Sequence, residues 1–175
     1  MNVLSLVHQT ITFTEVRQWL FFRRETGRVR TFLDFAIDGV PLRELALAWD
    51  QSVGTDRFST KLTEDDPHEA VNEIDALLGR IGVEPNEYQG LLCLPGSQNT
   101  TTDGLAAQLS FETDRVVWRN FAWGDASPWL DFDAPHRIEN APTFTFDRLQ
   151  YETVLLEARG HYLRYIERPA SFPER

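Results

Sequence analysis

Three side chains that could bind a metal ion lie close together in the C-terminal half of the chain. Asp131, Asp133 and His136 occur within six residues, in the run WLDFDAPH. Two carboxylates and an imidazole at this spacing could hold one divalent cation, with the histidine as a ligand or as a base. Asp-rich loops also serve as turns and helix caps, and a metal site usually takes a further ligand from elsewhere. The sequence therefore allows a metal-dependent enzyme with its site in this loop. This is the alternative to the interaction function set out at the end of this section.

Four carboxylates in the first half of the chain offer a different kind of site, a charged surface. Asp65, Asp66, Glu69 and Glu73 lie close together. Asp66 before Pro67, with Glu69 three residues on, is also typical of a helix start, because the aspartate side chain can accept a hydrogen bond from a free N–H of the first turn. The same residues therefore predict a capped helix and allow an acidic surface for a partner.

The net charge favours a basic partner over nucleic acid. The formal charge is −10, and between Asp50 and Glu87 ten carboxylates face only Arg57, Lys61 and Arg80. A negative field repels nucleic acid and can attract a basic partner and speed its association, although such a charge is more often a solvated face that keeps the protein soluble. The partner class we expect is a protein, and the oligomeric state stays open.

Basic and aromatic residues alternate near the N-terminus, a composition that could clamp single-stranded nucleic acid. The net charge of the chain opposes that function. An arginine-rich exposed face over a buried aromatic face is also the ordinary alternation of a hairpin. The residues concerned are Arg17, Trp19, Phe21, Phe22, Arg23, Arg24, Arg28 and Arg30.

The single cysteine, Cys93, lies among leucines, which predicts a buried thiol in place of a nucleophile. The GxSxG, HExxH, Walker A and GxGxxG patterns of common hydrolases and nucleotide-binding proteins are absent from the sequence. One cysteine forms no internal disulfide, which favours the cytoplasm, although a mature secreted chain would look the same. No run of about 18 apolar residues could span a membrane. We expect no cofactor.

The elements that must position these residues alternate between strands and helices. The start, MNVLSLVHQTITF, interrupts its apolar stretch with His8 and Gln9 and predicts a first strand in place of a secretory signal. A hairpin is predicted from 17–24 and 28–37, with its turn at Gly27. Alternation places Val29, Thr31, Leu33, Phe35 and Ile37 on one face of its second strand. Further strands are predicted at 88–94, 105–112 and 116–123, and helices at 41–49, 66–81 and 147–160, the last capped by Asp147 and ended by Gly160.

From about Phe32 to Arg159 the sequence resembles a group of uncharacterised actinobacterial-type proteins. The resemblance rests on the pieces FAIDGVPLREL, LLCLPG, DRVVWRNFAW and FTFDRLQYE, in that order. Many members have a cysteine-rich run suited to zinc, such as CPECGDLGCG, where this chain has CLPGSQNTTTDG, so only Cys93 matches. One thiolate does not make a Cys-based structural zinc site. The resemblance implies the scaffold and no activity.

These observations predict one α+β domain over residues 1–175, with a mixed or mainly antiparallel sheet, hairpins and about three helices. The function we expect is that of a non-catalytic, acidic interaction module of the immunity or regulatory type. Asp65, Asp66, Glu69 and Glu73 would attract a basic protein partner, and Trp129 would anchor it.

Overall fold

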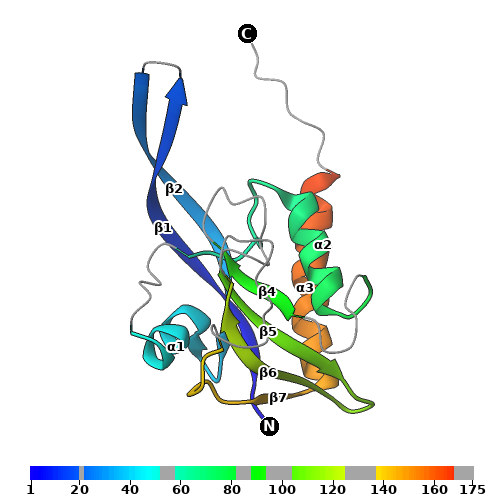
Figure 1. Cartoon of the computed structure of the whole chain (residues 1–175). Coiled ribbons are helices and arrows are strands. Elements are labelled where there is room, and N and C mark those ends of the chain that lie inside the picture. The colour runs from blue at the N-terminus through cyan, green and yellow to red at the C-terminus, as the bar shows by residue number, and fades with distance from the viewer. Residues whose placement is uncertain (20–21, 52–57, 82–87, 94–103, 125–136, 168–175) are drawn as a thin grey trace.

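The computed structural model describes residues 1–19, 22–51, 58–81, 88–93, 104–124 and 137–167, with the backbone alone for 14–19 and 22–25. These residues form an α+β fold with antiparallel strands and three helices, as predicted, but the strands divide into two sheets where one was expected (Figure 1). The first sheet contains β1 (Leu4–Trp19), β2 (Phe22–Ile37) and β3 (Val40–Pro41); the second contains β4 (Tyr88–Cys93), β5 (Gly104–Phe111), β6 (Arg115–Trp123) and β7 (Phe144–Asp147). The helices are α1 (Leu42–Trp49), α2 (Pro67–Leu77) and α3 (Arg148–Ile166).

Backbone hydrogen bonds join the two sheets at both sides. The extended segment 58–63 bonds β4 through the N–H of Cys93 and the carbonyl of Ser59 (2.7 Å), and β2 through the N–H of Leu33 and the carbonyl of Leu62 (2.8 Å). On the other side the N–H of Asn2 donates to the carbonyl of Thr145 in β7 (2.7 Å). The two sheets therefore enclose one shared core, because neither closes it alone.

Trp118 lies at the centre of this core. Its side chain is fully buried on β6 and makes edge-to-face contacts with Phe35 of β2 and Tyr151 of α3, at centroid distances of 5.6 and 6.1 Å. Aromatic pairs of this geometry each add about 0.5–1.5 kcal/mol beyond the burial of their area. One indole thus ties both sheets to α3, which packs side by side with α2 in Figure 1.

The prediction for the N-terminal hairpin placed its turn wrongly. β1 and β2 pair over 16 residues each, from Leu4 with Ile37 to Trp19 with Phe22, and Gly27 pairs with Thr14 inside the ladder. The run Glu25–Gly27 has turn-like composition, but the backbone ladder of a long two-stranded arm accepts such residues, because its hydrogen bonds need no apolar side chain there. In Figure 1 the upper half of this hairpin stands clear of the helices and of β4–β7.

The starts of α2 and α3 were predicted correctly, but their ends were not: α2 ends at Leu77, short of the predicted residue 81, before Gly79 with its φ of +68°. Asp66 accepts a hydrogen bond from the N–H of Glu69 (3.0 Å), and Asp147 accepts one from the N–H of Gln150 (2.9 Å), so both cap as expected. The predicted end of α3 at Gly160 is wrong, because the helix continues to Ile166. A glycine inside a helix costs about 1 kcal/mol, which burial of Tyr162 one half-turn later offsets. Among the described residues, no helix has both the length and the apolar character to cross a membrane.

Candidate functional site

The side chains of β2 that were predicted to face inward are buried in one part of the strand and exposed in the other. Phe35 and Ile37 are buried, Leu33 is half-buried, and Thr31 and Val29 are exposed, with 69% of Val29 accessible. All five point to the same side, as successive odd positions of a strand do. This one face of β2 therefore lies in two environments. It packs into the core at Phe35 and Ile37, and it borders an open surface between Val29 and Leu33.

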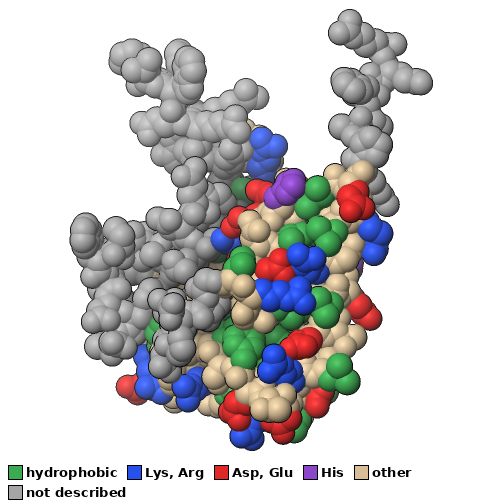
Figure 2. All heavy atoms as spheres, turned by 90° about the vertical axis from the view of Figure 1, so that its right-hand side faces the viewer, with side chains coloured by type: hydrophobic (Ala, Val, Ile, Leu, Met, Phe, Trp, Pro, Cys, Tyr) green, Lys and Arg blue, Asp and Glu red, His purple; other side chains and the backbone are tan. Residues whose placement is uncertain are grey.

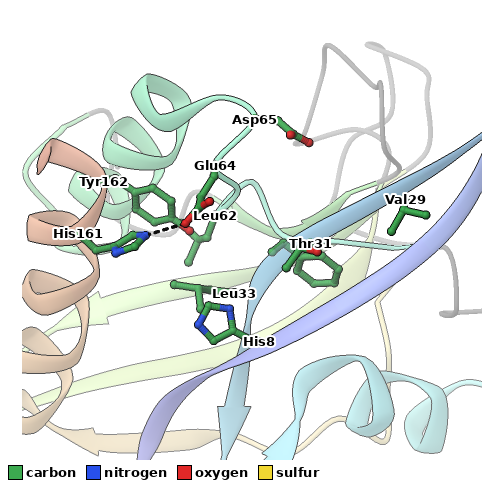
Figure 3. Close-up of a pocket in the computed structure, with 10 residues that line it drawn as sticks. His8, Val29, Thr31, Leu33, Leu62, Glu64, Asp65, His161 and Tyr162 are labelled. Atoms are coloured by element: carbon green, nitrogen blue, oxygen red, sulfur yellow. Dashed lines mark hydrogen bonds and ion pairs between the residues drawn. The ribbon is translucent and has the colours of Figure 1, made fainter. Parts of the chain in front are cut away.

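A hollow of about 240 Å³ lies over this open surface (Figure 3). It is smaller than the roughly 300–1,000 Å³ of pockets that enclose drug-sized ligands, so it suits one side chain or a small molecule. Its walls come from β1, β2, the loop before α2, and α3: His8; Val29 and 31–33; Leu62, Glu64 and Asp65; His161 and Tyr162.

The loop that supplies the acidic wall is held by hydrogen bonds to β2. The hydroxyl of Thr63 donates to the carbonyl of Thr31 (3.2 Å) and accepts from the N–H of Asp65 (3.2 Å). The bond between Leu33 and Leu62 precedes them, and the Asp66 cap follows. Glu64 and Asp65 are thus fixed between a sheet and a helix start, which positions their carboxylates.

His161 and Glu64 form a pair at one end of the hollow. Nε2 of His161 lies 3.1 Å from Oε1 of Glu64, as the dashed line in Figure 3 marks. The imidazole also contacts the rings of Tyr162 and Tyr165, at centroid distances of 5.2 and 6.2 Å. Both partners are about half exposed, so the pair adds little to folding stability and is accessible to a ligand.

Sequence reasoning missed both members of this pair. Glu64 and His161 are 97 residues apart, and the histidine lies beyond Gly160, where the helix was expected to end. One signal was present: Tyr151, Leu155 and Ala158 form a buried stripe that continues at i+4 to Tyr162. Following that stripe through the glycine would have placed His161 on α3.

The structure divides the four predicted carboxylates into two pairs. Asp65 and Asp66 are exposed, with 74% of the Asp65 side chain accessible and Nε of Arg30 lying 3.9 Å from its carboxylate. Glu69 and Glu73 both pair with Lys61, the only lysine of the chain. Only the first pair presents charge that is not already neutralised by a close lysine.

Glu73 lies largely inside the protein. Its side chain is 11% exposed, accepts a hydrogen bond from Nε2 of Gln89 (3.0 Å) and lies 3.8 Å from Nζ of Lys61. Burial raises the pKa of this carboxyl to about 7, while the nearby Lys61 acts in the opposite direction. Little of Glu73 is available to a partner.

Cys93 is buried, as predicted. Its thiol donates to the carbonyl of Ser59 at 3.4 Å, and burial raises its pKa to about 11. A thiol with that pKa stays protonated at neutral pH and is a poor nucleophile. The geometry at Cys93 therefore offers no support for thiol catalysis.

The remaining predicted site residues, Trp129, Asp131, Asp133 and His136, lie outside the described residues. The loop metal site and the tryptophan anchor stay predictions. Within the part of the chain that the structure describes, no three histidine, cysteine, aspartate or glutamate side chains converge in a way that could hold a metal ion.

Comparison of the chain with protein-family models, with curated proteins and with solved structures gave no match. The resemblance to the actinobacterial-type group stays a prediction. The hollow and the carboxylates beside it are the features of the described residues that bear on function.

Proposed function

We propose that this protein is a non-catalytic interaction module that binds a basic protein partner through three consecutive carboxylates, Glu64, Asp65 and Asp66. These three residues, named the acidic rim below, are all exposed, and the first two line the hollow. The observation that carries the proposal is the exposure of Asp65 on a loop held between β2 and α2. A preformed, rigid charge costs little entropy when a partner binds.

The charges around the acidic rim support a local attraction. The nearby cations Arg30 and Lys61 are mostly buried, with side chains 17% and 18% exposed, and Lys61 is engaged by Glu69 and Glu73. The rim carboxylates project further into solvent than either cation. Because exposed charges act over roughly 10 Å at ordinary salt, an approaching partner senses the rim first.

The face formed by α2 and α3 bears on how large the charged contact surface is. Figure 2 shows acidic, basic and apolar side chains mixed on this face, with no large region of a single sign. The excess of carboxylates in the chain therefore does not form a continuous negative surface on this face. This supports recognition through a small acidic centre in place of a wide negative field.

The test begins by finding the partner. A photo-crosslinking amino acid is placed at Asp65 in one variant and at Glu139, an exposed residue outside the hollow, in a second. Crosslinking in the native cells, followed by mass spectrometry, identifies proteins captured from the first position only. We expect a basic protein; capture of the same proteins from both positions would count against the acidic rim.

Association kinetics with the purified partner then test the mechanism. The double variant Asp65→Asn/Asp66→Asn removes two charges while asparagine keeps the helix cap. The matched control, Asp114→Asn/Glu139→Gln, removes two exposed charges elsewhere. We expect the first variant to lower the association rate about tenfold at low salt and the control to change it little. An association rate that does not depend on salt would overturn the proposal.

A further inference from the structure

We infer that the hollow beside the acidic rim receives a single cationic side chain, an arginine or a lysine of the partner. This inference rests on the proposed function and adds to it a defined point of insertion. The inference depends on three features together: a small volume, apolar surface on the walls, and carboxylates at the mouth. None of the three would support it alone.

The walls of the hollow match a side chain that is apolar along its stem and charged at its tip. Leu33 and Leu62 provide apolar surface, and Glu64 and Asp65 provide carboxylates. Figure 3 shows Leu33 and His8 on the strand side, with Glu64 and His161 at one end. Lysine and arginine bury their methylene groups on such surfaces while their charged ends stay near water or an anion.

The chemistry of the walls favours an organic cation over other ligands. A metal ion finds no set of three protein ligands among the described residues, and the hollow is no exception. An anion would be repelled by Glu64 and Asp65, and Arg30, a described cation beside them, already faces Asp65. His161 contacts Glu64 at Oε1, and a carboxylate accepts hydrogen bonds through both of its oxygens, so Glu64 can also accept from an incoming ammonium or guanidinium group.

Exposure of the carboxylates determines how strong this contact becomes. In water an ion pair with Glu64 or Asp65 adds little, because both side chains are half or more exposed. A partner that covers the mouth removes water and strengthens the same pair. The isolated cation should therefore bind weakly, and the partner should bind tightly.

Small probes test the hollow directly. The methylamides of Nα-acetyl-arginine and Nα-acetyl-lysine carry the cation on their side chains. The methylamide of Nα-acetyl-glutamine is the neutral control. NMR titration of the full chain follows the ring signals of His8 and His161 and the methyl signals of Leu33 and Leu62. We expect both cationic probes to shift these signals saturably, with dissociation constants on the order of millimolar, and the neutral probe to leave them unchanged.

Two variants block the hollow without changing the carboxylates. Thr31→Trp and His8→Trp each place a large side chain on an exposed lining position of the paired strands, where aromatic residues are well accepted. The matched control is Thr113→Trp, exposed in the turn between β5 and β6 and outside the hollow. We expect at least about a tenfold loss of probe affinity in each folded blocking variant, and about fivefold in Glu64→Gln.

The outcomes separate this inference from the proposed function. Equal shifts with the neutral probe, or unchanged probe binding in both blocking variants, would overturn the inference. If blocking leaves partner affinity intact while Asp65→Asn/Asp66→Asn lowers it, the acidic rim stands and insertion into the hollow fails. If the cationic probes bind but neither set of variants affects the partner, the proposed function fails, and the hollow instead binds a small organic cation.

Discussion

The hydroxyl of Tyr151 accepts a hydrogen bond from Nε1 of Trp118 at 3.3 Å and donates one to the carbonyl of Leu77 at 2.9 Å. Trp118 belongs to β6, Tyr151 to α3, and Leu77 is the last residue of α2. A carbonyl at a helix end has no partner within its own helix. One buried hydroxyl thus satisfies a helix terminus and an indole together, and links three elements through the core.

Removing that hydroxyl should destabilise the fold. Tyr151→Phe leaves the indole N–H and the Leu77 carbonyl buried without their partner, which costs about 1–3 kcal/mol of unfolding free energy. Tyr162→Phe is the matched control, because that ring is also buried but its residue lines the hollow. Urea denaturation should show the larger loss for Tyr151→Phe; equal losses would contradict the role of the linked hydrogen bonds.

The buried carboxyl of Glu73 should make stability depend on pH. Its pKa rises from 4.5 to about 7 on folding, so the folded protein binds this proton more tightly than the unfolded chain. The stabilisation that results is fully present below the unfolded value of 4.5 and is lost as pH rises through about 7. Glu73→Gln should therefore stabilise the protein at about pH 8.5, by up to roughly 3 kcal/mol, and change little near pH 4.5.

Denaturation of Glu73→Gln at both pH values checks this prediction. Glu69→Gln is the control, because it contacts the same lysine but is much more exposed. We expect its effect to stay within about 1 kcal/mol at either pH. A Glu73→Gln variant that is less stable than the native protein at the higher pH would show that the Lys61 pair outweighs the cost of burial.

The charge of Asp66 can be separated from its role as a cap. Asp66→Ala removes the oxygen that accepts from the N–H of Glu69 and should cost about 1 kcal/mol, whereas Asp66→Asn should cost only a few tenths. Thermal unfolding measures the difference. If both variants lower the partner's association rate equally, the loss arises from the missing charge, because only the alanine variant loses the cap.

Asn120 should tolerate glycine better than alanine. It has a φ of +52° at an irregularity in the pairing of β5 and β6, where its amide donates to Oε1 of Gln108 (2.7 Å) and accepts from Arg137 (2.6 Å). Alanine loses both bonds and keeps a Cβ in the left-handed region, at a cost of about 1–2 kcal/mol for the conformation alone. Glycine loses the same bonds without that strain. Chemical denaturation of both variants should rank alanine below glycine.

The sequence predicts features that depend on neighbouring residues and fails for those decided by distant ones. The caps at Asp66 and Asp147 each join a side chain to a backbone N–H three residues away, and both are confirmed. Gly27 and Gly160 are typical break signals in the sequence, but the partner strand and the core decide their conformation. The residues next to each glycine carry no information on the partner strand or on the core that decides its conformation.

The candidate site follows the same division. Acidity near Asp65 is visible in the sequence, but its separation into an exposed pair and a pair bound to Lys61 depends on segment 58–63 lying against α2. The hollow forms only when β1, β2, the loop and α3 come together. No spacing along the chain could have placed His161 beside Glu64.

The bond between Asn2 and Thr145 also constrains how the protein is made on the ribosome. The N–H of Asn2 donates to the carbonyl of Thr145, and the N–H of Thr145 donates to the Asn2 side chain, across 143 residues. During synthesis the N-terminal hairpin can form early, since its contacts are local, but Asn2 has no β7 strand to bond until the chain has been made beyond Thr145. Nascent chains halted before Thr145 should therefore remain sensitive to protease, and the final closure should be a late step in biosynthesis.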